Sequence, residues 1–146
     1  MTALIQLITS FFGSLGFSIL FNVQKKNLFL CSLGGVFCCG VYLLFYEYFE
    51  LHLFLACLAA GATCQIYAEI LARLLKAPAT IFYIGALIPM IPGGSLYRTM
   101  EAAVSADLPL FLRRGYETAY TTLGLAVGIG LISGLMFLFR NKSKKA

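Results

Sequence analysis

The segment 88–98 contains the densest set of residues that could interrupt a helix and leave backbone polar atoms free. It reads IPMIPGGSLYR, with Pro89 and Pro92 three residues apart and Gly93 and Gly94 directly after them. Each proline lacks an amide donor, so a carbonyl group loses its helical partner. Interrupted helices of this kind bind solutes in membrane transporters, because helix N-termini attract anions and free carbonyls hold cations. The alternative is an ordinary exit turn at a membrane surface.

Polar side chains near the ends of apolar runs form a second set of candidates. Tyr97 and Arg98 follow the glycine pair, and Arg98 could attract a carboxylate at the mouth of a path. Glu69 precedes Arg73 by four residues, the favourable order for a helical ion pair. An acid within a membrane often marks an ion path, so Glu69 is a candidate for ion coupling, with an interfacial ion pair as the alternative. Asn22 closes the first apolar run and could bind solute or cap a helix.

The remaining reactive side chains do not form a catalytic or metal-binding set. His52 is the single histidine, and one histidine without partners is not a metal site. The five cysteines fall within apolar runs, where cysteine behaves as a small hydrophobic residue. The sequence has neither a glycine-rich phosphate loop nor a Ser/His/Asp combination. We therefore expect a protein that is not an enzyme and that has no cofactor, no metal and no catalytic residues.

The composition excludes most soluble classes of protein. Of the 146 residues, 60% are hydrophobic and 12% are charged, whereas soluble domains have about 45–50% and about 25%. A small soluble domain needs polar residues to cover its large surface. The net charge of +5 does not indicate a nucleic-acid partner, because the basic residues lie at the ends of apolar runs and form no single stripe. The solvent for most of this surface should be a lipid bilayer.

Five charge-free runs have about the length that a helix needs to cross roughly 30 Å of hydrocarbon. In lipid the backbone must satisfy its own hydrogen bonds, so these runs should be helical. We predict an all-α integral membrane protein, a single membrane domain over residues 1–146 with about five transmembrane helices, the fourth broken by Pro and Gly. The predicted spans are 4–22, 28–46, 51–71, 78–94 and 118–139. Residues 95–117 form an outer polar segment with a short amphipathic helix that Pro109 ends.

The distribution of lysine and arginine predicts the orientation, because cytoplasmic loops carry an excess of these residues. With the N-terminus outside and the C-terminus in the cytoplasm, eight basic residues lie inside and three outside. The inside set is Lys25, Lys26, Arg73, Lys76, Arg140, Lys142, Lys144 and Lys145. The outside set is Arg98, Arg113 and Arg114. A re-entrant fourth segment would give seven against four, so a full crossing is favoured.

The last apolar run contains two pairs of glycines four residues apart, Gly124 with Gly128 and Gly130 with Gly134. Small residues at this spacing let helix backbones approach closely in lipid. The contact could be packing within the chain or an interface between subunits, and the spacing does not separate the two.

Three segments together resemble the threonine/serine exporter (ThrE) family. They are GFSILFNV at 16–23, the stretch around Pro78, and IPMIPGG at 88–94 with Tyr97. The resemblance covers essentially the whole chain and is to the small split subunit (YjjB-like), which is similar to the C-terminal membrane half of full-length exporters. It implies secondary export of small amino or organic acids, such as threonine, serine or succinate-like dicarboxylates, and a larger YjjP-like partner subunit. It carries over Asn22, Pro89, Pro92 and Gly93 as motif positions.

We therefore predict a multi-pass subunit in the cell inner (plasma) membrane that belongs to an oligomeric secondary exporter and works with the larger subunit. The solute would meet the broken fourth helix, with Asn22 facing it, and an ion gradient would drive export. The alternative is a non-transporting scaffold or assembly subunit whose partner alone moves the solute.

Overall fold

The computed structural model describes residues 2–143, and side chains over residues 3–138. This part of the chain is all-α, which confirms the predicted fold class. The elements are α1 (Thr2–Leu20), α2 (Lys25–Leu43), the π-helical turn η1 (Leu44–Tyr48), α3 (Leu53–Leu75), α4 (Ala79–Leu87), the 3-10 turn η2 (Ile88–Met90), α5 (Gly93–Val104) and α6 (Leu108–Ser143). Four helices are long and apolar enough to cross a membrane, or five if the bent pair from α4 to α5 is one span.

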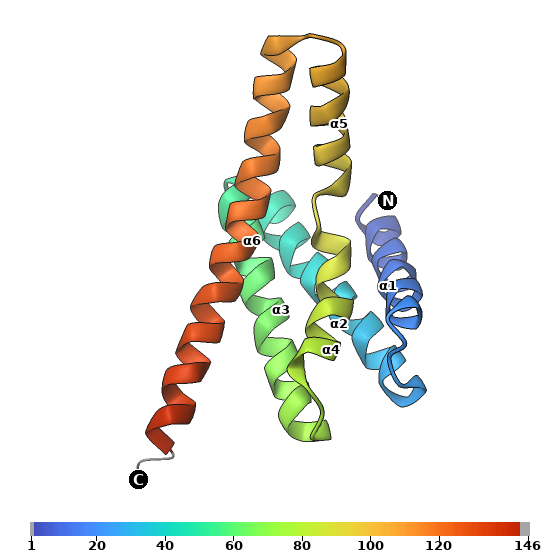
Figure 1. The fold of residues 1–146 in the computed structure, drawn as a ribbon, viewed down its shortest axis with the longest axis vertical. Coiled ribbons are helices and arrows are strands. Elements are labelled where there is room, and N and C mark those ends of the chain that lie inside the picture. Colours follow the sequence, from blue (N-terminus) through green and yellow to red (C-terminus); the bar gives the residue numbers. More distant parts are fainter. Residues whose placement is uncertain (1, 144–146) are drawn as a thin grey trace.

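The helices α1 to α4 form the body of the protein, and α5 with the first turns of α6 projects from one end of it as a hairpin (Figure 1). The α4–η2 helix and α5 are bent by 49° at the break, so α5 continues away from the end where α4 begins. The chain then returns through α6, which has 36 residues and is therefore about 54 Å long. The outer part of α6 extends beyond a hydrocarbon layer of roughly 30 Å.

The polar segment 95–117 is this helical hairpin, and Pro109 does not end its first helix as predicted. Helix α5 ends earlier, where Ala106 adopts a left-handed backbone with φ 54° and the Asp107 amide donates to the Ala102 carbonyl at 3.2 Å. The Asp107 carboxylate then accepts a bond from the Leu110 amide at 3.0 Å, which caps the start of α6. Pro109 lies in the first turn of α6, where its missing donor costs nothing.

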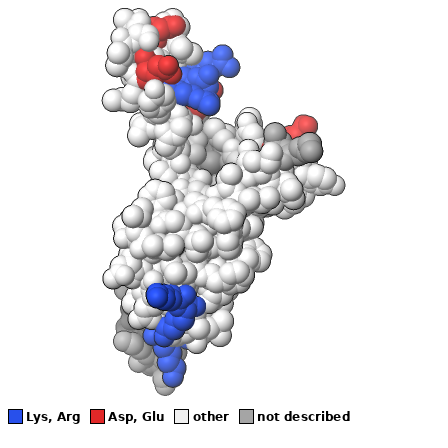
Figure 2. All heavy atoms as spheres, turned by 90° about the vertical axis from the view of Figure 1, so that its right-hand side faces the viewer, with Lys and Arg blue, Asp and Glu red and all other residues white. Residues whose placement is uncertain are grey.

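The basic side chains gather at the two ends of the molecule, while acidic side chains lie at the hairpin end and also on a projection at mid-height (Figure 2). Lys25 and Lys26 begin α2, and Arg73 and Lys76 lie at the end of α3, at the same end of the body. Arg98, Arg113 and Arg114 lie in the hairpin at the opposite end. The two groups are those that the sequence assigns to opposite sides of the membrane. The structure does not describe the side chains of Arg140 and Lys142. Lys144 and Lys145 lie outside the described residues.

Small side chains bring the helices of the body together. All five cysteines are buried and free, as expected of packing residues. Two of them also reach α4: the Cys31 thiol donates to the Ile81 carbonyl at 3.6 Å, and the Cys64 thiol donates to the Tyr83 carbonyl at 3.8 Å. The core around α4 thus consists largely of thiols and methyl groups, with Phe82 as its one large, fully buried side chain among the described residues.

The first glycine pair of α6 packs within the chain, against α3. A Cβ atom on Gly124 would lie 2.6 Å from the Phe54 carbonyl oxygen, and one on Gly128 would overlap the Leu58 carbonyl oxygen. Gly61 of α3 faces α6 in the same way, because a Cβ atom on Gly61 would lie 2.7 Å from the Leu125 carbonyl oxygen. Cβ atoms on Gly130 and Gly134 would meet no atom within 4 Å. The first pair is therefore a helix-packing contact within this chain.

We predict that Gly128→Ala destabilises the protein, whereas Gly130→Ala does not. The added methyl at Gly128 overlaps the backbone of α3, and overpacking of this kind costs about 1–3 kcal/mol. The same change at Gly130 meets open space. Thermal melting of the two purified variants should show a lower midpoint for Gly128→Ala alone, and equal melting temperatures would contradict the close α3–α6 crossing.

Candidate functional site

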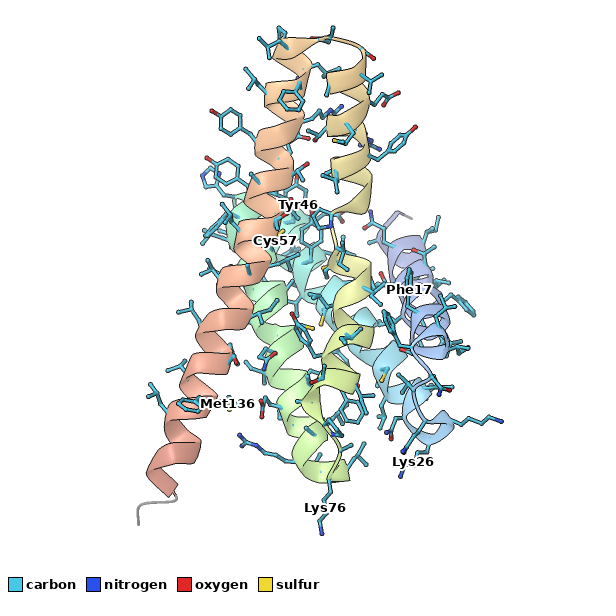
Figure 3. The ribbon with its side chains drawn as sticks, in the orientation of Figure 1. Phe17, Lys26, Tyr46, Cys57, Lys76 and Met136 are labelled. Atoms are coloured by element: carbon cyan, nitrogen blue, oxygen red, sulfur yellow. The ribbon has the colours of Figure 1, made fainter. Side chains whose placement is uncertain are left out.

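A cavity of about 390 Å³ lies at the break between α4 and α5. This volume is within the range of about 300–1,000 Å³ that is usual for small-molecule sites. Five segments surround the cavity: the end of α2 with η1, the start of α3, the break itself, the first turn of α5 and the middle of α6. Figure 3 shows two of its lining residues, Tyr46 and Cys57, at the level of the break.

The break supplies one wall of this cavity through Pro89 and Pro92. Because Pro89 has no amide hydrogen, the carbonyl of Gly85 cannot receive the usual helical bond. Pro92 precedes α5, and Ser95 in the first turn of that helix also lines the cavity. The Gly93 amide donates to the Ile91 carbonyl at 2.7 Å, which leaves the amides of Gly94 and Ser95 in the first turn, at the positive end of the helix dipole, without helical acceptors. This wall is therefore suited to an anionic group.

The rest of the lining carries a carboxylate and several hydroxyl groups. Glu117 and Thr121 face the cavity from α6, and Tyr42 and Tyr46 face it from α2 and η1. The two tyrosine rings are stacked, with centroids 5.4 Å apart and planes 10° from parallel. Stacking restricts both rings, so their hydroxyl groups have defined positions relative to the cavity.

Glu117 also forms ion pairs with two arginines of α6. Its Oε2 lies 3.2 Å from Arg114 Nη1, and its Oε1 lies 3.9 Å from Arg113 Nε. The Glu117 side chain is 40% exposed, and exposed pairs contribute at most about 1 kcal/mol. A cationic group that enters the cavity can therefore replace an arginine at this carboxylate for little cost.

A second hollow of about 390 Å³ lies next to this ion pair, between α5 and α6. Arg98, Glu101 and Arg114 line it. The Glu117–Arg114 pair thus connects the two spaces, with the carboxylate lining the first and the guanidinium lining the second. Close by, the hydroxyls of the buried Thr99 and the partly buried Thr118 are 3.1 Å apart and hold α5 against α6.

The residues predicted from the sequence lie in several different places. Pro89 and Pro92 line the break cavity, and Arg98 lines the neighbouring hollow. Tyr97 is 70% exposed and lines neither space. Gly93 and Gly94 are exposed, and a Cβ atom on either would meet nothing within 4 Å. Neither has a positive φ, so their backbone conformation is one that other residues also adopt.

Asn22 does not face the break, in contrast to our prediction. It is exposed at the end of α1, close to Lys25 and Lys26, whereas the break lies near the other end of α1 (Figure 1). Its backbone is left-handed with φ 55°, and its amide donates to the Ile19 carbonyl at 2.9 Å. Asparagine tolerates this conformation better than most residues. The position is that of a helix cap, the alternative that the sequence also allowed.

Glu69 lies in the half of α3 remote from the break. It is twelve residues after Cys57 in the same helix, which corresponds to about 18 Å. The expected pair with Arg73 is present, with Oε2 and Nη2 3.7 Å apart. Both residues line a small hollow of about 120 Å³ beside Met136 of α6. Ion coupling by Glu69 stays a prediction, but this acid does not belong to the break cavity.

Sequence reasoning did not identify the polar wall of the cavity. Glu117 is the residue just before the last predicted span, so its position in the sequence places it among the solvated charges of the polar segment. Tyr42, Tyr46 and Thr121 lie within apolar runs and look like ordinary membrane residues. The sequence contains part of the signal, which is a cluster of polar residues where α6 enters the apolar region. These residues are Glu117, Thr118, Thr121 and Thr122.

A sequence model of the threonine/serine exporter family (ThrE) matches residues 6–135. The chain belongs to this family. The match includes the whole break cavity, all three arginines of the hairpin and the close α3–α6 crossing. No solved structure matches the chain. The ThrE family is a family of transporters, and this chain is a membrane protein with a solute-sized cavity at its broken helix.

We predict that a cysteine at position 95 is open to water, whereas one at position 8 is not. Ser95 lines the break cavity, while Ile8 lies 49% exposed on the apolar outer face of α1, where lipid covers it. Maleimides react with thiolates, which form only in contact with water. In native membranes, Ser95→Cys should react with a charged maleimide at least ten times faster than Ile8→Cys.

The five buried cysteines of the parent chain supply the background reaction. If Ser95→Cys reacted no faster than that background, the cavity would not be connected to water.

Proposed function

We propose that this chain is the membrane subunit of a secondary exporter for small hydroxy amino acids such as threonine and serine, acting with a larger subunit of the same family. The observation that carries the proposal is that the lining of the break cavity includes both a carboxylate and the first turn of a helix. Glu117 offers a negative charge to an ammonium group, and the first turn of α5 offers amide donors to a carboxylate. A zwitterion carries both groups on one carbon.

The charge of the cavity favours an amino acid over a succinate-like dicarboxylate. The described residues that line it include one carboxylate and no lysine or arginine. A dicarboxylate would bring a second negative group towards Glu117 and, unlike an ammonium group, could not take the place of an arginine at this carboxylate. The tyrosine, serine and threonine hydroxyls around the cavity are suited to the side-chain hydroxyl of threonine or serine. Arg98, in the adjoining hollow, would attract the carboxylate as the solute leaves.

The orientation in this proposal follows the charge distribution. The end with Lys25, Lys26, Arg73 and Lys76 faces the cytoplasm, and the hairpin faces outward, in the cell inner membrane. The break cavity then lies at the outer end of the path. Helix α4 with η2 is only twelve residues, or about 18 Å, so the chain has few elements with which to enclose a path alone. The larger subunit would supply the missing wall, and an ion gradient would supply the energy.

The proposal predicts that Glu117→Gln lowers threonine export while Glu101→Gln does not. Glutamine keeps the size of the side chain but removes the charge that holds the ammonium group. A hydrogen bond to a charged group contributes about 1.5–3 kcal/mol, so the KM for threonine should rise about tenfold to a hundredfold. Glu101 lines the neighbouring hollow and has no place in the break cavity. Efflux of labelled threonine from cells with both subunits measures the effect.

Two results of this experiment would contradict the proposal. Wild-type efflux by Glu117→Gln would show that the break cavity does not bind the ammonium group. Full efflux from cells that contain the larger subunit alone would support the scaffold alternative, in which this chain moves no solute.

A further inference from the structure

Two serine hydroxyls of α1 are buried without a hydrogen-bond partner among the described residues. They belong to Ser14 and Ser18, whose exposed fractions are 0% and 1%. The two residues are four apart and so share one helix face. A buried hydroxyl without a partner costs about 1–3 kcal/mol, so stability alone would favour alanine at both positions. Unsatisfied groups of this kind need an explanation beyond packing.

Both hydroxyls point at places where glycine opens the neighbouring helix. A Cβ atom on Gly85 of α4 would lie 2.7 Å from Ser18 Oγ, and one on Gly35 of α2 would overlap Ser14 Oγ. The hydroxyls therefore occupy space that any larger residue in α2 or α4 would fill. The Ser14 hydroxyl is pressed against backbone and apolar atoms, whereas the Ser18 hydroxyl also lies beside the Cys31 side chain, whose Sγ is 3.6 Å from the same Cβ position on Gly85.

Ser18 lines a second cavity, between α1 and α4, with a volume of about 150 Å³. Among the described residues that line this cavity, the other hydroxyl side chain is that of Thr80. The apolar walls include Phe21, Val23 and Ile84. A cavity of this volume can hold a molecule the size of benzene. The cavity lies at the end of the bundle that carries the lysines, since Phe21 and Val23 come only a few residues before Lys25 and Lys26.

Ser14 lies between this inner cavity and the break cavity and lines neither of them. The Cβ position on Gly35 that overlaps Ser14 Oγ is also 3.2 Å from Pro89 Cγ, and Pro89 lines the break cavity. Gly85, whose carbonyl lacks its usual helical donor because of Pro89, lines the inner cavity together with Ser18. The two hydroxyls and this carbonyl thus follow one another along the α1–α4 contact, in the region between the two cavities.

We propose that Ser14 and Ser18 form the inner half of the solute path and hydrogen-bond the polar groups of a small hydroxy amino acid as it moves from the cytoplasmic end to the break. This inference rests on the proposed function. A serine hydroxyl can donate to a carboxylate and accept from an ammonium or hydroxyl group. The solute, when present, satisfies the hydroxyls that the folded chain leaves unpaired.

The test compares the double variant Ser14→Ala with Ser18→Ala against the single variant Ser10→Ala. Ser10 lies one turn earlier on the same face and is 8% exposed, but its hydroxyl is not one of the buried hydroxyls without a partner, so it is the control. We expect threonine efflux from cells with both subunits to fall at least tenfold in the double variant and to be unchanged in Ser10→Ala. The melting temperature of the purified double variant should equal or exceed that of the wild type, because two unpaired hydroxyls are removed.

Two results would overturn the inference while leaving the proposed function intact. In the first, the double variant exports threonine at the wild-type rate. In the second, efflux and melting temperature fall together, which would mean that the serines serve folding. A wild-type complex that exports neither threonine nor serine would instead contradict the proposed function, and the path role of the serines would fall with it.

Discussion

Pro89 and Pro92 remove two backbone donors from a helix that would otherwise run straight from the end of α3 into the outer segment. The resulting bend of 49° turns α5 away from the body. The chain must then return through the 36 residues of α6, and the space left between α5, α6 and the ends of α2 and α3 is the break cavity. The projecting hairpin, the long return helix and the proposed solute site all depend on this one interruption.

A chain with 12% charged residues has few side chains with which to bind a polar solute. In the proposed site one carboxylate, several hydroxyls and the backbone freed by proline would take that part. The scarcity of charged side chains also explains the packing of the helices. Thiols, methyl groups and glycines bring the helices so close that backbone carbonyls of one helix contact atoms of the next. Close packing excludes water from α4, and this makes the unpaired hydroxyls of Ser14 and Ser18 unusual.

The features that could be predicted from the sequence are those with local causes. Apolar run lengths predict the helical membrane fold, and proline chemistry predicts the break at 88–92. The division of basic residues also depends only on their order in the chain. The failures concern which end of the bundle a residue reaches and which neighbours it meets there. Asn22 is a polar residue near a span end, but it lies at the end opposite the break. Glu117 gains its place in the cavity only because α6 extends past the predicted span and folds back along α5.

The central claim is that the break cavity selects a zwitterion with one negative and one positive group. The most direct measurement is competition: efflux of labelled threonine from membrane vesicles that contain both subunits, with unlabelled serine, threonine or succinate added at the cytoplasmic face. The account predicts that serine and threonine compete and that succinate at the same concentration does not. Strong competition by succinate, with little effect of serine, would contradict it.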